Sequence, residues 1–212
     1  MTDGQAATFV QSYGTAWFAL RNRARCQAGE WLLVLGAGGG VGLAAVDVGH
    51  ALGMHVIAAA SSESKRALAL AHGAEAVIDT SSEDVKTRAK ELSGGGVHGV
   101  YDPVGGALAE AGLRSLRDDG QLLIVGFAAG EIPRLPANQI LLRNRRVTGV
   151  DWGGWVGSHQ AENEQLLVDV VASISRGELH PVEPTAYAMA DVAVALQDQL
   201  DRKVIGKSVL VP

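Results

Sequence analysis

The sequence predicts an α/β fold in which six parallel strands form one sheet with helices on both faces. Short apolar runs alternate with stretches of helical periodicity along most of the chain. The run Trp31-Leu32-Leu33-Val34-Leu35 is apolar throughout, which is typical of a strand buried on both faces. Many of the 27 glycines follow such runs, where tight connections to the next helix are expected. A doubly wound parallel sheet explains all of these features.

The six expected strands are short apolar runs bounded by glycine or polar residues: 31–35, 54–60, 76–78, 97–101, 121–127 and 146–150. The expected helices show apolar residues at helical spacing: 3–20 in part, 41–52, 61–72, 83–92, 107–116, 138–142 and 160–176. Asp118-Asp119-Gly120 is a turn signal, and we expect it to separate the helix at 107–116 from the strand at 121–127.

The first strand runs into the glycine cluster Gly36-Ala37-Gly38-Gly39-Gly40-Val41-Gly42, and a helix follows at once. Glycines let backbone N–H groups approach a ligand closely, and a helix N-terminus favours negative charge. Aligned with the dinucleotide-binding pattern G-x-G-x-x-G, the key positions hold Ala37, Gly39 and Gly42. The turn predicts a dinucleotide site, with the N–H groups of Gly39, Gly40 and Val41 on the pyrophosphate. Close helix–strand packing without a ligand is the alternative.

The end of the second strand bears on the choice of nucleotide. An NAD site has Asp or Glu about twenty residues after the first glycine position. This sequence has Ala58-Ala59-Ala60-Ser61-Ser62 there, so no acid at the strand end repels a 2′-phosphate. Ser61, Ser62 and the cation of Lys65 are the candidates to contact such a phosphate. The residues alone leave Lys65 open between that contact and a solvated surface lysine.

The C-terminal stretch departs from the alternation of strand and helix. Residues 181–188 and 207–211 predict extended segments without an evident partner in the sheet. Residues 191–200 predict a helix with Asp191 as its N-cap and these residues facing inward: Val192, Ala195, Leu196 and Leu200. We therefore expect a nucleotide-binding domain at 1–178 and a remnant of another domain at 179–212.

Composition and charge exclude several functions. The formal net charge of −5 provides no basic surface for nucleic acid, and no apolar run is as long as a bilayer span. Cys26 is the only cysteine, and the six histidines show no metal-ligand spacing. We expect a cytoplasmic enzyme without a metal site, which binds neither nucleic acid nor membrane.

Motifs from one end of the chain to the other resemble the medium-chain dehydrogenase/reductase superfamily, and within it the zinc-independent NADPH:quinone oxidoreductase branch. The matching pieces are Tyr13-Gly14-Thr15-Ala16-Trp17-Phe18-Ala19-Leu20, Gly29-Glu30, Gly39-Gly40-Val41-Gly42, His72-Gly73-Ala74, Tyr101-Asp102-Pro103-Val104-Gly105-Gly106, Val125-Gly126-Phe127-Ala128 and Gly206-Lys207-Ser208-Val209-Leu210. Their order and spacing together make the resemblance specific. It implies a Rossmann-type domain and a GroES-like domain of which only 179–212 is represented, so we expect a fragment or a naturally shortened relative.

The resemblance also implies roles for single residues. Lys65 matches a lysine that contacts the 2′-phosphate, which favours NADP(H), although Thr80 stands where the branch often has an assisting tyrosine. The residues expected to line the rest of the cofactor groove are Thr15, Val104, Gly126, Phe127, Val150 and Trp152. An N-cap role for Thr15, and a subunit contact of Trp152 with Trp155, are the alternatives. The sixth strand is expected to pair with its mate in a homodimer.

These observations predict an oxidoreductase that transfers hydride from NADPH to a small molecule, either a quinone or an activated alkene. No catalytic side chain is identified. Because the substrate-facing wall belongs to the missing domain, we expect nucleotide binding without full turnover. The alternatives are a non-catalytic NADPH-binding or dimerisation module and the enoyl reductase piece of a larger synthase.

Overall fold

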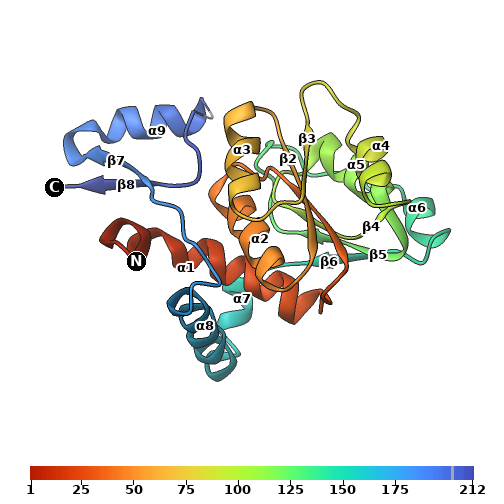
Figure 1. Ribbon diagram of the computed structural model, residues 1–212, viewed down its shortest axis with the longest axis horizontal. Helices are drawn as coiled ribbons and strands as arrows, with labels where there is room; N and C mark the ends of the chain where they lie inside the picture. The colour runs from red at the N-terminus through yellow and green to blue at the C-terminus, as the bar shows by residue number, and fades with distance from the viewer. Residues whose placement is uncertain (202) are drawn as a thin grey trace.

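A computed structural model describes residues 1–201 and 203–212. Its main sheet has six parallel strands in the order β3-β2-β1-β4-β5-β6 (Figure 1). The strands are β1 (Trp31–Leu35), β2 (His55–Ala60), β3 (Ala76–Asp79), β4 (Val97–Asp102), β5 (Leu116–Ile124) and β6 (Arg146–Gly149). The order reverses between β1 and β4, and ligands of such sheets bind at the carboxyl ends of the strands beside that point. The predicted α/β class is confirmed.

Helices cover both faces of the sheet. On one face lie α1 (Asp3–Trp17), α2 (Gly40–Ala51), α3 (Glu63–Ala71) and α8 (Gln160–Ser175). On the other lie α4 (Val85–Leu92), α5 (Gly106–Ser115) and the short α6 (Ala137–Leu141). Side chains of β1 alternate between the two cores, with Leu32 and Val34 in the first and Leu33 and Leu35 in the second. This explains why the strand is apolar at every position.

Capping side chains and a glycine with positive φ set the ends of several helices. Thr2 forms a capping box with Gln5 at the start of α1, which continues as a π-helix, η1 (Phe18–Arg23). Ser62 caps α3, and Asp84 caps α4 through the backbone N–H of Thr87, 2.8 Å from its carboxylate. Gly73 has a φ of +94°, as expected for the residue that closes α3.

One expectation about the second half of the sheet was wrong, and one short helix was missed. Asp118-Asp119-Gly120 does not precede β5 but lies within it, because Leu116 already pairs with Val97. The register shifts between Val97 and Gly99, and Asp119 has a φ of +61°, so the strand absorbs the turn residues as an irregularity. A short helix, α7 (Trp152–Val156), was not expected and follows β6.

Residues 185–201 and 203–212 form a small C-terminal unit beside the main sheet (Figure 1). It contains β7 (Thr185–Ala188), the 3₁₀-helix η2 (Met189–Asp191), α9 (Val192–Leu200) and β8 (Ser208–Val211). The two strands pair with each other in parallel, so each supplies the partner that the sequence left unassigned. No helix in the described part of the chain is long and apolar enough to cross a membrane.

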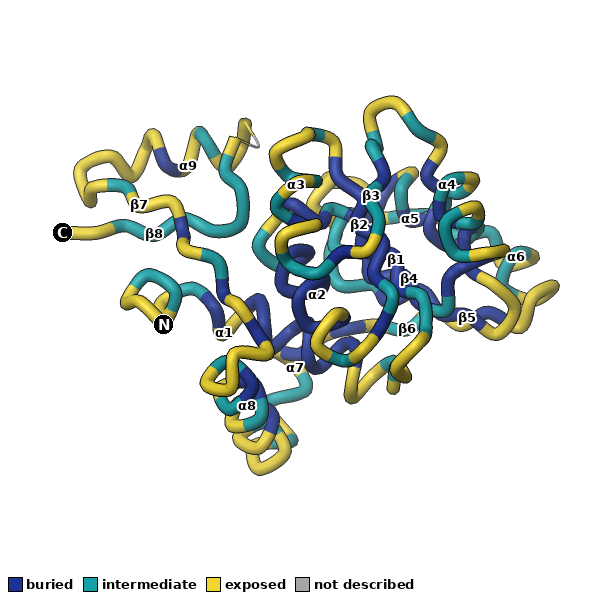
Figure 2. Tube along the Cα trace, in the orientation of Figure 1, coloured by how far each residue is buried: buried dark blue, intermediate teal, exposed yellow. Residues whose placement is uncertain are grey.

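The apolar face predicted for α9 is mostly exposed (Figure 2). Ala195 is buried, but Val192, Leu196 and Leu200 are 42%, 62% and 77% exposed, which corrects the expectation that all four face inward. Periodicity indicates which face of a helix suits a core, but it does not indicate which element covers that face. Asp191 holds the N-cap position, yet its side chain makes no capping hydrogen bond.

Candidate nucleotide-binding site

The site begins at the turn from β1 into α2, on the carboxyl edge of the sheet. Gly36 has a φ of +61°, and the N–H of Gly39 donates to its carbonyl at 3.1 Å, which closes the turn. Hydrogen bonding of α2 starts with Leu43 N–H on the carbonyl of Gly39, at 2.8 Å. The amides of residues 40–42 therefore have no acceptor within the helix, which is the arrangement that binds an anion.

The glycines of the turn differ in what a side chain would meet. A Cβ atom on Gly42 would clash with the carbonyl oxygen of Gly36 and come within 3.0 Å of Ala37 Cα. Gly42 is thus required for close packing of helix on strand. Gly39 is exposed, and among the described residues a Cβ there would come within 4 Å of the Gly36 oxygen alone, at 3.6 Å, so the space outside it is open. In the dinucleotide-binding pattern, the second glycine allows a pyrophosphate to approach and the third allows close packing of helix on strand. Gly39 and Gly42 have these two properties.

Two lysine side chains lie across the turn. A Cβ on Gly38 would be 2.6 Å from Cδ of Lys65, and a Cβ on Gly40 would be 2.8 Å from Cδ and Cε of Lys207. Both aliphatic stems therefore pack directly on glycine backbone, next to the open end of α2. Lys207 was not among the expected site residues, although it belongs to the matched motif near the C-terminus. Its place depends on a contact between distant segments, which local pattern does not reveal.

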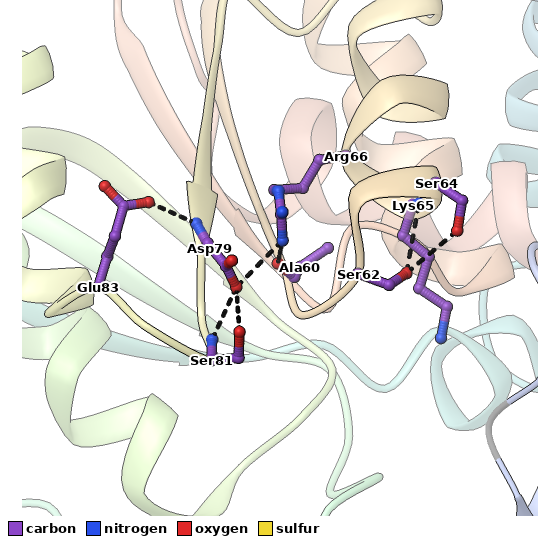
Figure 3. A network of polar contacts seen from close by, with 8 residues as sticks. All are labelled: Ala60, Ser62, Ser64, Lys65, Arg66, Asp79, Ser81 and Glu83. Carbon is purple, nitrogen blue, oxygen red and sulfur yellow. Dashed lines mark hydrogen bonds and ion pairs between the residues drawn. The ribbon is translucent and has the colours of Figure 1, made fainter.

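Ser62 and Ser64 lie at the N-terminal end of α3, directly after β2 (Figure 3). Ser62 Oγ accepts the N–H of Lys65 at 3.4 Å as the cap of α3, and it lies 3.3 Å from Ser64 Oγ. A hydroxyl that accepts in a cap still has a proton to donate. Ser61 is exposed beside it. The end of β2 itself carries no carboxylate, as expected.

An acid that sequence reasoning missed lies at the end of the neighbouring strand, β3. Asp79 Oδ1 pairs with Arg66 at 3.0 Å and accepts the hydroxyl and N–H of Ser81 at 2.6 and 2.9 Å (Figure 3). The Ser81 hydrogen bonds, with a smaller contribution from Arg66, hold the pKa of Asp79 below its usual value. Arg66 also donates to the carbonyl of Ala60 at 3.1 Å, so it compensates this charge right beside the β2 end.

The turn after β4 is organised by the buried Asp102. Its Oδ1 accepts the N–H groups of Val104 and Gly105 at 2.8 and 2.9 Å, and Gly105 adopts a φ of +75°. Burial raises the pKa of this carboxyl, while the two N–H groups lower it less. Val104 packs against the β1 turn, since its Cγ2 is 2.7 Å from where a Cβ on Gly36 would be. The turns on both sides of the switch point are therefore in contact.

The segment after β5 lies against the same turn. The N–H groups of Val125 and Gly126 donate to the backbone carbonyl of Asp102 at 2.9 and 3.3 Å. Phe127 is 42% exposed, and its ring edge lies 3.0 Å from where a Cβ on Gly105 would be. Val104, Gly126 and Phe127 are thus brought together at one end of the sheet, as the sequence led us to expect.

The remaining expected groove residues are largely buried. Thr15 is 6% exposed, and its hydroxyl donates to the carbonyl of Gln11 at 2.6 Å within α1, so it is not an N-cap. Val150 and Trp152 are each 8% exposed. The Trp152 ring packs on Gly14 of α1, and its Nε1–H donates to Asn163 at 3.0 Å. These contacts explain how α1, α7 and α8 are held together.

Comparisons with known proteins find relatives over most of the chain. A family model described as "Zinc-binding dehydrogenase" matches residues 40–173. The chain is 38% identical over 208 residues to the quinone oxidoreductase-like protein 2 of Bos taurus, which covers 97% of this chain and 60% of that protein. It is 33% identical over 215 residues to a mycocerosic acid synthase-like polyketide synthase of Mycobacterium tuberculosis, covering 99% of this chain and 10% of the synthase.

Solved structures have the same fold. The quinone oxidoreductase of Thermus thermophilus, solved also in complex with NADPH, is 34% identical to this chain. It superposes with a TM-score of 0.87 over 100% of this chain and 67% of its own. The present chain spans about 57 to 60% of the length of the quinone oxidoreductase-like relatives that it matches.

Proposed function

Because the chain belongs to the zinc-binding dehydrogenase family, we propose that it binds NADPH and serves as the cofactor-binding part of a reductase of quinones or activated alkenes. The observation that carries the proposal is the combination of two features: the residues at the end of β2 and the glycine turn between β1 and α2. No acid ends β2, and Lys65 lies across Gly38 between that strand end and the open N-terminus of α2. A nucleotide with one more phosphate on its ribose fits this arrangement of charge.

Each part of the cofactor has proposed contacts. The pyrophosphate lies on the amides of Gly39, Gly40 and Val41, with the ammonium of Lys207 nearby. The 2′-phosphate is held by Lys65, Ser61 and Ser62. The proposed contacts around the adenosine and nicotinamide halves are Thr15, Val104, Gly126, Phe127, Val150 and Trp152. Bound nicotinamide supplies the hydride, and the protein contributes its position and the surrounding charges.

The family description mentions zinc, but the residues present do not fit a zinc site. Within residues 1–201 and 203–212, no three His, Cys, Asp or Glu side chains are placed to hold a metal ion. The thiol of Cys26 has its pKa raised to about 12, chiefly by burial, which disfavours the thiolate that zinc requires.

Calorimetric titration with NADPH and NADH tests the proposal directly. We expect tighter binding of NADPH, and we expect Lys65→Ala to weaken NADPH by about tenfold while changing NADH by less than about threefold. Loss of one charge-assisted contact to a phosphate accounts for this difference. Equal losses for the two nucleotides would remove Lys65 from the 2′-phosphate site, and absence of binding by the unmodified chain would contradict the proposal as a whole.

A second candidate is the enoyl reductase part of a larger synthase. It is favoured by the match to the polyketide synthase, of which this chain corresponds to 10%. Both candidates use the same cofactor groove, so nucleotide binding does not separate them. The two candidates are separated by measuring NADPH oxidation by a complete protein that contains this chain, with a soluble quinone and an enoyl thioester compared as acceptors.

A further inference from the structure

A buried carboxylate on α2 is not among the residues proposed to contact the cofactor. Asp47 is 1% exposed. Its Oδ2 accepts the hydroxyl of Tyr13 at 2.7 Å and the backbone N–H of His180 at 2.5 Å, and its Oδ1 lies 3.3 Å from Nδ1 of His180. Burial, together with the neighbouring carboxylate, holds the pKa of the Tyr13 phenol above its usual value, so the phenol retains the proton that it donates.

His180 lies beyond the end of α8 at Ser175, where the chain starts toward the C-terminal unit. Residues 181–184 cross the N-terminal part of α1, where Gln5 donates to the carbonyl of Pro181 at 2.6 Å. The N–H of Thr185 then donates to the carbonyl of Lys207 at 2.9 Å. Hydrogen bonds and the backbone of residues 180–185 thus connect the Asp47 carboxylate to Lys207.

The same unit rests on the glycine turn. Gly206 N–H donates to the carbonyl of Gly38 at 3.1 Å, and Gly206 forms a parallel bridge with Gly39. The stem of Lys207 lies on Gly40. A small pocket between α1, α2 and this segment is lined by Tyr13, Gly40 and Lys207, among others. Asp47 follows Gly40 by about two helical turns, roughly 10 Å along α2. One helix therefore presents its N-terminus to the phosphate and anchors the segment that brings a lysine to it.

We infer that Asp47 is a positioning residue for cofactor binding: it anchors residues 180–185 and thereby holds Lys207 over the phosphate-binding end of α2. This inference rests on the proposed function, because it assigns Lys207 a contact with the pyrophosphate. Asp47 itself has no proposed contact with the cofactor. The competing explanation is that its hydrogen bonds stabilise the fold generally, with no special relation to Lys207.

Hydrogen exchange without any nucleotide tests the anchoring step. In Asp47→Ala, the amides of Thr185 and Gly206 are expected to exchange at least about tenfold faster, because their segment loses its attachment. The amides of β1 serve as the internal control and are expected to keep their protection. Unchanged exchange at Thr185 and Gly206 would overturn the inference, whether or not the chain binds NADPH.

A double-mutant cycle tests the link to Lys207. Asp47→Ala and Lys207→Ala are each expected to weaken NADPH about tenfold, and the double variant no more than Lys207→Ala alone. Asp47→Ala combined with Lys65→Ala is the matched control, and its losses should multiply. Multiplying losses in both cycles would show that Asp47 does not act through Lys207, and would overturn the inference.

Asp47→Asn completes the series, because an amide oxygen can replace the acceptor without the charge. We expect it to restore most of the affinity lost in Asp47→Ala, leaving a deficit of about threefold. If the alanine variant fails to fold, the same cycles are measured with Asp47→Asn, where the threefold loss must disappear in the presence of Lys207→Ala. Failure of the unmodified chain to bind NADPH contradicts the proposed function instead, and the exchange experiment still decides the anchoring.

Discussion

Gly39 and Gly42 belong to one turn but are expected to matter for different reasons. Gly39→Ala places its methyl group in open space with ordinary backbone dihedrals, φ −86° and ψ 161°, so the midpoint of thermal unfolding should stay unchanged. The methyl group obstructs the approach of a pyrophosphate, and we expect about tenfold or greater loss of affinity for NADPH and NADH alike. Titration and thermal unfolding of the same sample measure both effects.

Gly42→Ala is the matched control and should behave in the opposite way. Its methyl group meets the backbone of Gly36 and Ala37, which has no room to move, so we expect destabilisation of about 1–3 kcal/mol. Nucleotide affinity of the folded fraction should change less than in Gly39→Ala. If Gly39→Ala binds both nucleotides normally, the turn is not the phosphate site.

Among single residues, the sequence predicted those whose neighbours in the fold are also close to them along the chain. The glycine turn, the serines after β2 and the missing acid at that strand end were predictable, because each lies within a few residues of a recognisable strand–helix junction. Lys207 and the Arg66–Asp79 pair were not, since they depend on segments that meet only in the folded chain. Trp152 was identified as a residue of interest, but its packing on Gly14 carries no sequence signal of its own.

Among the helices, α4 provides a test of local stability that is independent of the cofactor. Asp84 Oδ1 accepts the N–H of Thr87 at 2.8 Å, and this cap holds the pKa of the carboxyl below its usual value. We expect Asp84→Ala to lower the unfolding midpoint by about 2–4 °C at neutral pH. Asp84→Asn, which keeps an acceptor, should lose less.

The pH dependence of this effect has a definite sign. Because the folded pKa of Asp84 is lowered, its contribution is complete above the unfolded value, about pH 4, and is lost as pH falls through the folded value. The difference between the natural chain and Asp84→Ala should therefore shrink below about pH 4. A difference that stayed constant into that acidic range would mean that the ionised carboxylate is not responsible.

The elements themselves were predicted well where periodicity and capping agree. The six strands of the main sheet and the helices between them were all identified, with boundaries shifted by a few residues. β5 was cut short because Asp118-Asp119-Gly120 has the composition of a turn, whereas pairing of Leu116 with Val97 extends the strand through it. For α9, the pattern predicted the helix correctly but not the exposure of Leu196 and Leu200.

For the whole molecule, the outer edge of β6 bears on assembly. β6 ends the strand order, and its Val147 is 40% exposed. We propose that two chains pair through this edge in a homodimer, since a free edge offers unpaired N–H and C=O groups. Val147→Lys should shift the mass measured by light scattering from dimer to monomer, while Val168→Lys, at a 60% exposed position of α8, should not. A monomeric natural chain at high concentration would contradict the proposal.

The last prediction concerns turnover by these 212 residues. Within residues 1–201 and 203–212, the C-terminal unit pairs β7 with β8 and leaves Val192, Leu196 and Leu200 exposed. We expect that these residues do not enclose an acceptor beside the proposed nicotinamide position. An acceptor that is not held against the nicotinamide loses the advantage of a fixed reactive geometry. We expect the chain to bind NADPH, measured by calorimetry, but to oxidise it at least about a thousandfold more slowly in the presence of quinone than ordinary reductases do. The same preparation must serve both measurements, so that inactivity is not confused with unfolding. Ordinary rates of NADPH-dependent quinone reduction by this chain alone would show that the acceptor site is already complete.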